Sequence, residues 1–256
     1  MNAEKSFLGH DRPLITSMVQ ATTPARIKEL IDLSRAKGAD AFGMQFCRLD
    51  PEFRNANTYR ELFEYAGDEP VYVTYYRGEL NKGKTDDELA DEMLKIASCG
   101  KILCDVMGDM FDPQPGELTD DPEAISRQMA YIDALHQKGA EVLMSSHVCK
   151  FTPPERVLEI ALAHQARGAD ICKIVVKAET PDEEIENLKM IDMLKRNLKI
   201  PFLFLCGGDC YLLRRIGGEV GCCMYLCVAE HDELSTKVQP LIDHVYTIQN
   251  LLREGK

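Results

Sequence analysis

The stretch GADICKIVVK, residues 168–177, decides the fold, because a glycine ends an amphipathic run and an apolar segment of strand length follows at once. The same corner occurs three times, as KGAD at 37–40, KGAE at 138–141 and RGAD at 167–170. Glycine is the usual residue at a helix end, and a continuous apolar run is typical of a strand buried on both faces. The repeat therefore predicts helices that alternate with parallel strands.

Eight apolar runs of strand length divide the chain, and amphipathic helical patterns lie between them, as at 23–38, 85–100 and 152–168. The runs lie at 14–19, 41–46, 71–76, 101–106, 141–147, 171–177, 201–207 and 222–228. Eight strand–helix units predict an α/β fold, a (β/α)8 TIM barrel, as a single domain over residues 1–256. The alternative, an open doubly wound sheet, would place a glycine-rich turn after the first strand, and MVQATTPAR at 18–26 is no such turn.

Composition and charge exclude several classes of protein. The formal net charge of -12 argues against a nucleic-acid or anionic-membrane surface. No run approaches the roughly 18 apolar residues of a membrane span, and the start MNAEKSFLGHDRP has no apolar signal region. We therefore expect a cytoplasmic protein. The ten cysteines form no C-x-x-C pair and lie mostly in apolar runs, which favours reduced core thiols over a metal site.

The candidate catalytic groups are Lys173, inside the apolar run at 171–177, and His147, at the end of the run at 141–147. In a barrel the chemistry lies at the C-terminal ends of the strands, where neighbouring strands bring these two side chains together. An apolar environment disfavours an ammonium, and the resulting free amine attacks a carbonyl to form a Schiff base. A histidine beside it is suited to general acid–base catalysis. Taken singly, each residue also fits a structural role.

Three arginines, Arg48, Arg77 and Arg214, follow predicted strands and would meet at the same mouth. Arginine binds carboxylates in a bidentate manner and stays charged when half-buried, so the trio points to an acidic substrate. For Arg48 and Arg77 the alternative is an ion pair with a loop acid such as Asp50 or Glu79.

Two segments carry a family resemblance. VLMSSHVCKFTPP at 142–154, followed by GADICKIVVKAETPDE at 168–183, resembles type I 3-dehydroquinate dehydratase, a Schiff-base dehydratase of the shikimate pathway. The Arg-Leu-Asp motif at 48–50, CGGDCYLLR at 206–214 and STKVQ at 235–239 support it, and the resemblance covers essentially the whole chain. It implies dehydration of 3-dehydroquinate to 3-dehydroshikimate, without metal or organic cofactor.

The resemblance also implies a role for each matching residue. Lys173 would form the imine, while His147 would act as general acid–base and assist imine formation and hydrolysis. Asp105 would orient the histidine. The remaining residues would contact substrate: Arg214 its carboxylate, Ser235 and Gln239 from a lid over it, and Ser17, Arg48 and Arg77 its polar groups.

Departures from the family pattern leave the substrate open. Phe46 and Asn81 stand where the family has acids, Leu213 replaces a serine, and Lys237-Val238 replaces Pro-Gly. The alternatives are a divergent Schiff-base dehydratase or a class I aldolase-type lyase on a related keto acid, and a sensor that has lost turnover. The expected partner is a small keto acid, and a homodimer stays open.

Overall fold

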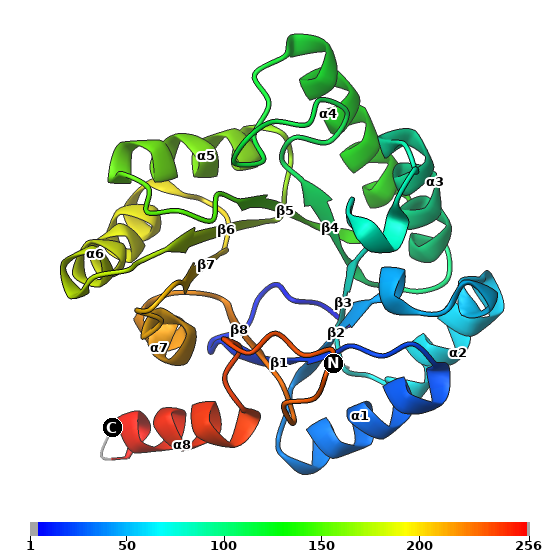
Figure 1. The fold of residues 1–256 in the computed structure, drawn as a ribbon, viewed down its shortest axis with the longest axis horizontal. Coiled ribbons are helices and arrows are strands. Elements are labelled where there is room, and N and C mark those ends of the chain that lie inside the picture. The colour runs from blue at the N-terminus through cyan, green and yellow to red at the C-terminus, as the bar shows by residue number, and fades with distance from the viewer. Residues whose placement is uncertain (1–4, 255–256) are drawn as a thin grey trace.

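The computed structural model describes residues 5–254, in which eight strands alternate with eight helices around a central barrel (Figure 1). The strands are β1 Leu14–Val19, β2 Ala41–Gln45, β3 Val71–Thr74, β4 Leu103–Met107, β5 Glu141–His147, β6 Ile171–Lys177, β7 Phe202–Gly207 and β8 Met224–Cys227. The helices are α1 Pro24–Ala36, α2 Ala56–Tyr65, α3 Asp86–Ala97, α4 Pro122–Gln137, α5 Pro154–Ala166, α6 Pro181–Asn197, α7 Leu213–Val220 and α8 Ile242–Arg253. Short 3-10 turns lie at Phe46–Arg48, Pro51–Phe53 and Glu79–Asn81.

All paired strands run parallel in the order β7-β6-β5-β4-β3-β2-β1-β8. The backbone N–H of Cys223, just before β8, donates to the carbonyl of Phe202 on β7 at 2.9 Å and brings the two edge strands together. The sheet thus curls into a barrel with the helices outside it, as Figure 1 shows. The prediction of a (β/α)8 barrel is confirmed, and the open sheet is excluded.

Local sequence signals start and stop the helices as expected. Thr23 caps α1 and accepts a hydrogen bond from the Arg26 backbone, with proline at the next position. Thr85 and Glu88 form a reciprocal capping box at α3. Gly168, in the corner after α5, has φ +96°, a conformation that glycine adopts without the cost that a Cβ would add. The three predicted helices therefore begin and end within a few residues of their expected bounds.

Side-chain alternation along the strands separates the barrel interior from the layer beneath the helices. Gly43 shows how closely the interior is packed: a Cβ there would meet the Met18 sulfur at 2.2 Å and the Tyr72 ring at 3.3 Å. The missing side chain on β2 makes room for Tyr72 inside the barrel. Outward-facing residues instead fill apolar clusters between strands and helices.

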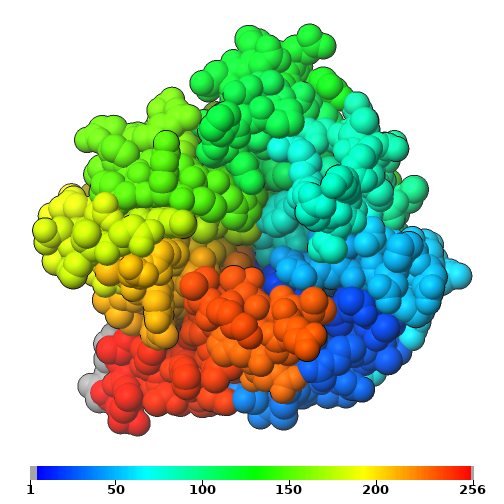
Figure 2. Space-filling view, viewed as in Figure 1, coloured from blue at the N-terminus to red at the C-terminus, as the bar shows by residue number. Residues whose placement is uncertain are grey.

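Three general features of the described residues complete the fold. None of their helices combines the length and apolar character of a membrane span. Their ten cysteines are free thiols, most of them buried. On the face seen in Figure 2, the segment that follows β8 (orange) borders the central hollow of the barrel. The site lies in this hollow, where the strands end.

Candidate active site

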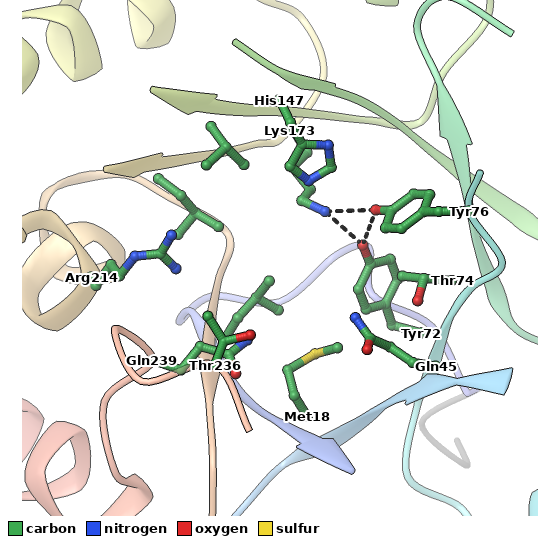
Figure 3. A pocket seen from close by; sticks show the side chains of 13 residues that line it. Met18, Gln45, Tyr72, Thr74, Tyr76, His147, Lys173, Arg214, Thr236 and Gln239 are labelled. Atoms are coloured by element: carbon green, nitrogen blue, oxygen red, sulfur yellow. Dashed lines mark hydrogen bonds between the residues drawn. The ribbon is translucent and has the colours of Figure 1, made fainter. Parts of the chain in front are cut away.

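A cavity of about 180 Å³ lies at the C-terminal ends of the barrel strands (Figure 3). Its polar lining comes from six different parts of the chain and includes Gln45, Thr74, His147, Lys173, Arg214 and Gln239. No aspartate or glutamate lines it, so the exposed formal charges are those of the lysine and the arginine. The part of the chain that the structure describes holds no group of three His, Cys, Asp or Glu placed for a metal ion. The cavity therefore suits a small anionic molecule.

Lys173 lies deep in this cavity, where its side chain is 5% exposed and all three N–H donors are engaged. Its Nζ donates to Tyr72 Oη at 3.0 Å, to Tyr76 Oη at 2.9 Å and to Asp105 Oδ2 at 3.0 Å. The prediction of apolar surroundings for this lysine is wrong, because three oxygen atoms surround its amine. Three donated hydrogen bonds require the three protons of an ammonium.

Asp105, on β4, is the centre of this cluster, and its side chain is completely inaccessible to solvent. Ser145 donates to its Oδ1 at 2.5 Å, while the hydroxyls of Tyr72 and Tyr76 donate to its Oδ2. Burial by itself would raise the pKa of Asp105, but the charge of Lys173 and these three hydrogen bonds outweigh it and leave the pKa below its ordinary value. The buried carboxylate is thus ionised and fully solvated by protein groups.

His147 has a different partner from the one expected. Its Nδ1 lies 2.7 Å from Glu117 Oε2, which also accepts the His147 backbone N–H at 2.9 Å. Since a carboxylate only accepts, Nδ1 carries the proton and Nε2 is left as the basic atom. Asp105 was expected to orient the histidine, but its partners are Lys173, Ser145 and the tyrosines. Glu117 takes that role instead.

The backbone at Glu117 supports this assignment. Glu117 lies in the loop between β4 and α4 with φ +52°, a conformation that is uncommon and costly for a residue with a Cβ. The Ser146 hydroxyl donates to the carbonyl of Glu117 and holds the loop at this point against β5. A strained residue that presents its carboxylate to a histidine in a cavity is the pattern of a functional site.

Arg214 and Gln239 face Lys173 from the other side of the cavity, as Figure 3 shows. Arg214 is 8% exposed, and its Nε donates to the Cys206 carbonyl at 2.6 Å. Desolvation lowers its pKa, and no described acid forms an ion pair with it. The buried Oε1 of Gln239 has no hydrogen-bond partner among the described residues. The cation is a ready partner for a carboxylate, and the amide oxygen is a ready acceptor for a hydroxyl of the same molecule.

Two predicted substrate contacts, Ser17 and Ser235, turn their hydroxyls away from this cavity. Ser17 Oγ lies 2.7 Å from Ser34 Oγ on α1, on the outer face of β1. Ser235 Oγ accepts from the Asp232 backbone N–H at 2.9 Å and donates to the Asp232 carbonyl at 3.1 Å, within its own turn. The next residue, Thr236, lines the cavity in its place.

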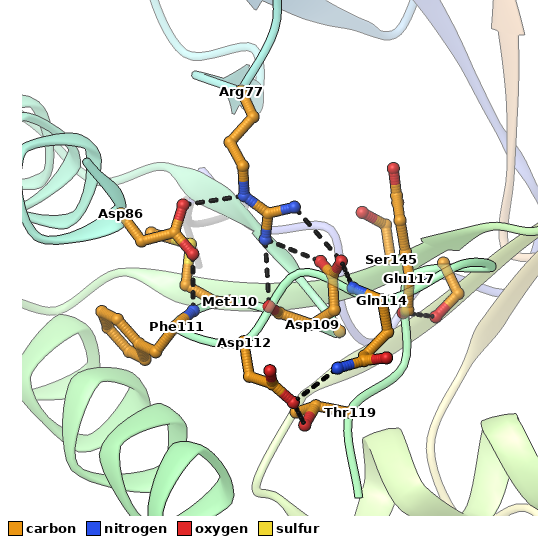
Figure 4. Close-up of polar contacts among 12 residues, drawn as sticks. Arg77, Asp86, Asp109, Met110, Phe111, Asp112, Gln114, Glu117, Thr119 and Ser145 are labelled. Atoms are coloured by element: carbon orange, nitrogen blue, oxygen red, sulfur yellow. Dashed lines mark hydrogen bonds and ion pairs between the residues drawn. The ribbon is translucent and has the colours of Figure 1, made fainter. Parts of the chain in front are cut away.

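Arg77 is engaged outside the cavity, in the clamp of Figure 4. Its Nε donates to Asp86 at 2.7 Å, and its two terminal nitrogens bind Asp109 through the carboxylate at 2.7 and 3.1 Å and the carbonyl at 3.0 Å. Asp86 also accepts the Phe111 backbone N–H at 2.6 Å. The structural alternative considered for Arg77 therefore holds, with Asp86 and Asp109 rather than Glu79 as the acids. The clamp joins α3 to the loop after β4.

Strand β2 ends one residue earlier than the expected motif requires, and this changes the meaning of Phe46. The Phe46 ring is fully buried and stacks on Tyr59 at a centroid distance of 4.8 Å, in the core outside the barrel. Gln45 faces the cavity instead, and its Oε1 accepts a hydrogen bond from Arg48 Nε at 2.7 Å. The interpretation that Phe46 replaces a substrate-reading acid is therefore wrong. Gln45 is the residue that lines the cavity at the end of β2, and Arg48 contacts Gln45 without lining the cavity.

Asn81 likewise supports the site rather than lining it. Its side chain is buried, and its Nδ2 donates to the Tyr76 carbonyl at 2.7 Å. The sequence reasoning missed both Tyr76 and Tyr72, because the run VYVTYY at 71–76 looks like any buried strand. It also missed Glu117, which stands in a loop without a motif. Alternation along the predicted strand at 71–76 puts Tyr72, Thr74 and Tyr76 on one face, and this is the signal that could have found both tyrosines.

Comparisons with known proteins bear on the family and the fold of this chain. A family model described as type I 3-dehydroquinase matches residues 18–226. Comparison with curated proteins finds no significant match in sequence.

Solved structures of similar fold include 3-dehydroquinate dehydratase from Geobacillus kaustophilus, with a TM-score of 0.80 and 20% identity over 97% of this chain and 94% of the other. The type I enzyme from Clostridium difficile, solved with covalently modified comenic acid, has a TM-score of 0.79 and 19% identity over 97% and 95% of the two chains. The enzyme from Enterococcus faecalis has a TM-score of 0.73 and 17% identity over 97% and 96%. At these identities the likeness establishes the fold, while the family match covers most of the sequence.

Proposed function

This chain belongs to the type I 3-dehydroquinase family, a family of Schiff-base hydro-lyases, and we propose that its cavity dehydrates 3-dehydroquinate to 3-dehydroshikimate through an imine on Lys173. The observation that carries the proposal is the pairing of a buried lysine with an unpaired arginine across a cavity of about 180 Å³. The lysine is the nucleophile for the ketone, and the arginine is the partner for the ring carboxylate.

His147 supplies the proton transfers that follow imine formation. With Nδ1 bound to Glu117, Nε2 takes a proton from the carbon next to the iminium, and the C–H electrons move onto nitrogen to give an enamine. The enamine then expels the β-hydroxyl, which leaves as water with the proton that His147 returns. The iminium is restored in conjugation with the new double bond, and hydrolysis frees the product and Lys173.

Substrate orientation would come from Arg214 and Gln239. Both line the cavity opposite Lys173, and neither has a carboxylate partner among the described residues. Burial removes water from the Arg214 guanidinium and lowers its pKa. A bound anion therefore stabilises the charged guanidinium by replacing the lost solvation. Thr236, which precedes Gln239 in the same loop, offers a hydroxyl to the bound molecule.

A related keto acid is the second candidate substrate, favoured by Gln45. An amide at this position can both donate and accept, whereas the family acid only accepts, so a different hydroxyl pattern would fit equally well. The two candidate substrates are distinguished by steady-state kinetics. The measurement compares kcat/KM for 3-dehydroquinate with kcat/KM for keto acids that lack one ring hydroxyl. Turnover of such an analogue without turnover of 3-dehydroquinate would favour the second candidate.

We also propose a cellular location and an oligomeric state: the enzyme is a cytoplasmic homodimer. Exposed leucines on α8, Leu251 at 63% and Leu252 at 48%, offer an apolar surface for self-association. Light scattering coupled to gel filtration measures the molecular mass, and a monomer at micromolar concentration contradicts the dimer.

Borohydride trapping tests the imine directly. Reduction in the presence of 3-dehydroquinate should add the mass of the reduced ligand to the wild type, and Lys173→Ala should gain none. Lys177 is the fair competitor, because it is on the same face of β6, although it is exposed at the strand end. An adduct mapped to Lys177 would overturn the assignment.

The carboxylate site is tested with a matched pair of neighbouring arginines. Arg214→Ala should raise KM by roughly tenfold to a hundredfold, the worth of one hydrogen bond to a charged group. Arg215→Ala is the control, because the Arg215 guanidinium lies 4.6 Å from the Tyr211 ring and does not line the cavity. Equal KM values for the two variants would exclude Arg214 as the anion ligand.

A further inference from the structure

The resting state of Lys173 poses a chemical problem that the proposed function leaves open. An ammonium with three engaged N–H donors has no lone pair with which to attack a carbonyl. A proton must leave Nζ before the imine forms, and another proton must reach the carbonyl oxygen so that it departs as water. Some group in contact with Lys173 has to carry these protons.

His147 is not in that group of contacts. Its ring hydrogen-bonds Glu117, and the hydrogen bonds of Lys173 go to Asp105 and the two tyrosines alone among the described residues. Asp105 is the base within reach at 3.0 Å. Its side chain, however, is 0% exposed and does not line the cavity, so it cannot touch a substrate oxygen itself. A third group must connect Asp105 with the substrate.

We propose that Tyr76 is that third group, a catalytic residue that relays protons between Asp105 and the substrate oxygen while the imine forms and hydrolyses. Its hydroxyl contacts Lys173 Nζ at 2.9 Å, donates to Asp105 Oδ2 and lines the cavity (Figure 3). This inference rests on the proposed imine at Lys173 and assigns its formation to the Asp105–Tyr76 pair, which leaves the later C–H and C–O steps to His147.

The protons balance without any exchange with solvent. Lys173 first gives one N–H proton to Asp105, and its lone pair forms the C–N bond. The carbonyl oxygen takes the Tyr76 hydroxyl proton as Asp105 replaces it, which yields a carbinolamine and restores the carboxylate. A second N–H proton passes to Asp105 and returns through Tyr76 to the carbinolamine hydroxyl, which leaves as water. The sequence begins with the Lys173 ammonium and ends with the Lys173 iminium, and Asp105 is ionised in both states.

Tyr72 makes the same contacts as Tyr76 but differs in position. Both tyrosines line the cavity, but Tyr72 is 0% exposed, whereas Tyr76 is half-buried past the end of β3, with its ring edge-on to His147 at a centroid distance of 5.5 Å. Tyr76 is therefore the hydroxyl on the side from which a carbonyl approaches, beside the second proton-transfer group. Desolvation and then Asp105 raise the pKa of Tyr76 well above its ordinary value, so a concerted relay through the neutral phenol is required.

Rapid-quench borohydride trapping measures imine formation separately from turnover, with 3-dehydroquinate and 3-dehydroshikimate as the two probes. Tyr76→Phe should slow adduct formation by about a hundredfold, the usual effect of a positioned acid–base group. Tyr72→Phe, the matched control, should slow it by about tenfold, the lower end of the range for a lost hydrogen bond to a charged group, because Tyr72 also contacts Asp105 and Lys173 but does not relay protons to the substrate. His147→Ala should trap adduct at nearly the wild-type rate although its turnover is lost.

Asp105→Asn adds a second readout, the pH dependence of the trapping rate, which would not change if Asp105 only positioned its neighbours. Without the internal base, solvent must deprotonate Lys173, so the trapping rate of this variant should rise about tenfold per pH unit from pH 6 to 9, below the ordinary lysine pKa of about 10.4. The wild-type rate should change much less over the same range. Circular dichroism melts confirm that each variant is folded.

The outcomes separate the relay from the function on which it rests. Absence of any wild-type adduct overturns the imine and the relay together. A wild-type adduct with equal rates for Tyr76→Phe and Tyr72→Phe overturns the relay alone, as does an Asp105→Asn deficit that is constant with pH. A gap of about tenfold between the two tyrosine variants, together with pH recovery in Asp105→Asn, establishes the relay.

Discussion

The two faces of strand β5 carry polar residues that do different work. On the inner face, Ser145 binds ionised Asp105, and His147 binds the carboxylate of Glu117. On the outer face, Ser146 lies 3.0 Å from Nε2 of His164, a histidine on α5 that is completely buried. His147 is hydrogen-bonded to a charged group at the cavity, whereas the hydrogen-bond partners of His164 are neutral. The face of the strand therefore decides whether a serine or histidine belongs to the candidate site or to the core.

Burial has different consequences for the two histidines. Desolvation, followed by the nearby Arg167, lowers the pKa of His164 to about 3, and its Nδ1 lies 3.3 Å from the Cys172 sulfur. His164 is therefore a neutral member of the core. His147 is half-buried, and its ring lines the cavity. Four predictions separate inward-facing from outward-facing positions, beginning with the largest free-energy effect.

The largest effect is expected at the end of β2, where Gln45 faces in and Phe46 faces out. Phe46→Glu should lower the free energy of unfolding by more than about 4 kcal/mol, because it removes a stacked core ring and buries a carboxylate. Gln45→Glu should leave stability within about 1 kcal/mol, since it lies at the cavity beside Arg48. Urea unfolding of both variants makes the comparison. Stability equal to wild type in Phe46→Glu would contradict the outward placement.

Acid should destabilise the fold through His164. Its folded pKa lies below that of the unfolded chain, so the unfolded state binds more protons between about pH 6.5 and 3, and stability falls as pH falls through this window. The loss reaches roughly 3 kcal/mol by pH 4, at 1.36 kcal/mol per pH unit. Denaturant midpoints from pH 7 to 4 measure it. His164→Gln should be less stable at pH 7 but show a flatter profile, and an unchanged slope would assign the acid loss to other groups.

On the inner face, His147→Ala should reduce kcat by roughly 10² to 10⁴-fold, the range for a general acid–base group. Its melting temperature should change little, because the side chain is half-buried at the mouth. Steady-state kinetics with 3-dehydroquinate and a thermal melt give the two values. A near-normal kcat would show that proton transfer uses another group.

The smallest effect is expected at Glu117. Glu117→Gln keeps the shape of the side chain but removes the charge that orients Nδ1 of His147, which should cost about 1.5–3 kcal/mol of transition-state stabilisation. That loss corresponds to roughly tenfold to a hundredfold in kcat, with KM unchanged. Asp112→Asn, in the same loop with Thr119 and Gln114 as partners, is the control and should leave kcat unaltered. Equal kcat in both variants would remove Glu117 from the catalytic assembly.

Alternation within single strands explains why some predicted contacts failed. Ser17 and Phe46 were placed in the site by motif alone, yet each has the outward parity of its strand, while Met18 and Gln45 have the inward one. When a motif is aligned to a strand with an error of one residue, every side chain is assigned to the wrong face of that strand. Because β2 gives way to a 3-10 turn at Phe46, the shift becomes visible only in three dimensions.

The sequence by itself determined the architecture and the relative placement of the proposed reactive pair. Eight apolar runs alternate with Gly-capped helical patterns, as in a (β/α)8 barrel, and this places Lys173 and His147 on neighbouring strands at one end. These properties follow from local pattern and chain order.

Only the tertiary structure decided which groups surround that pair. Asp105 contacts Lys173 rather than His147, and Glu117 reaches the histidine from a strained loop. Tyr76 contacts the lysine from a position just past β3, far away in sequence. Arg77 turns out of the mouth because two loop acids hold it there. Contacts of this kind depend on strand register, loop conformation and competition among several charged partners, and none of these leaves a local pattern in the sequence.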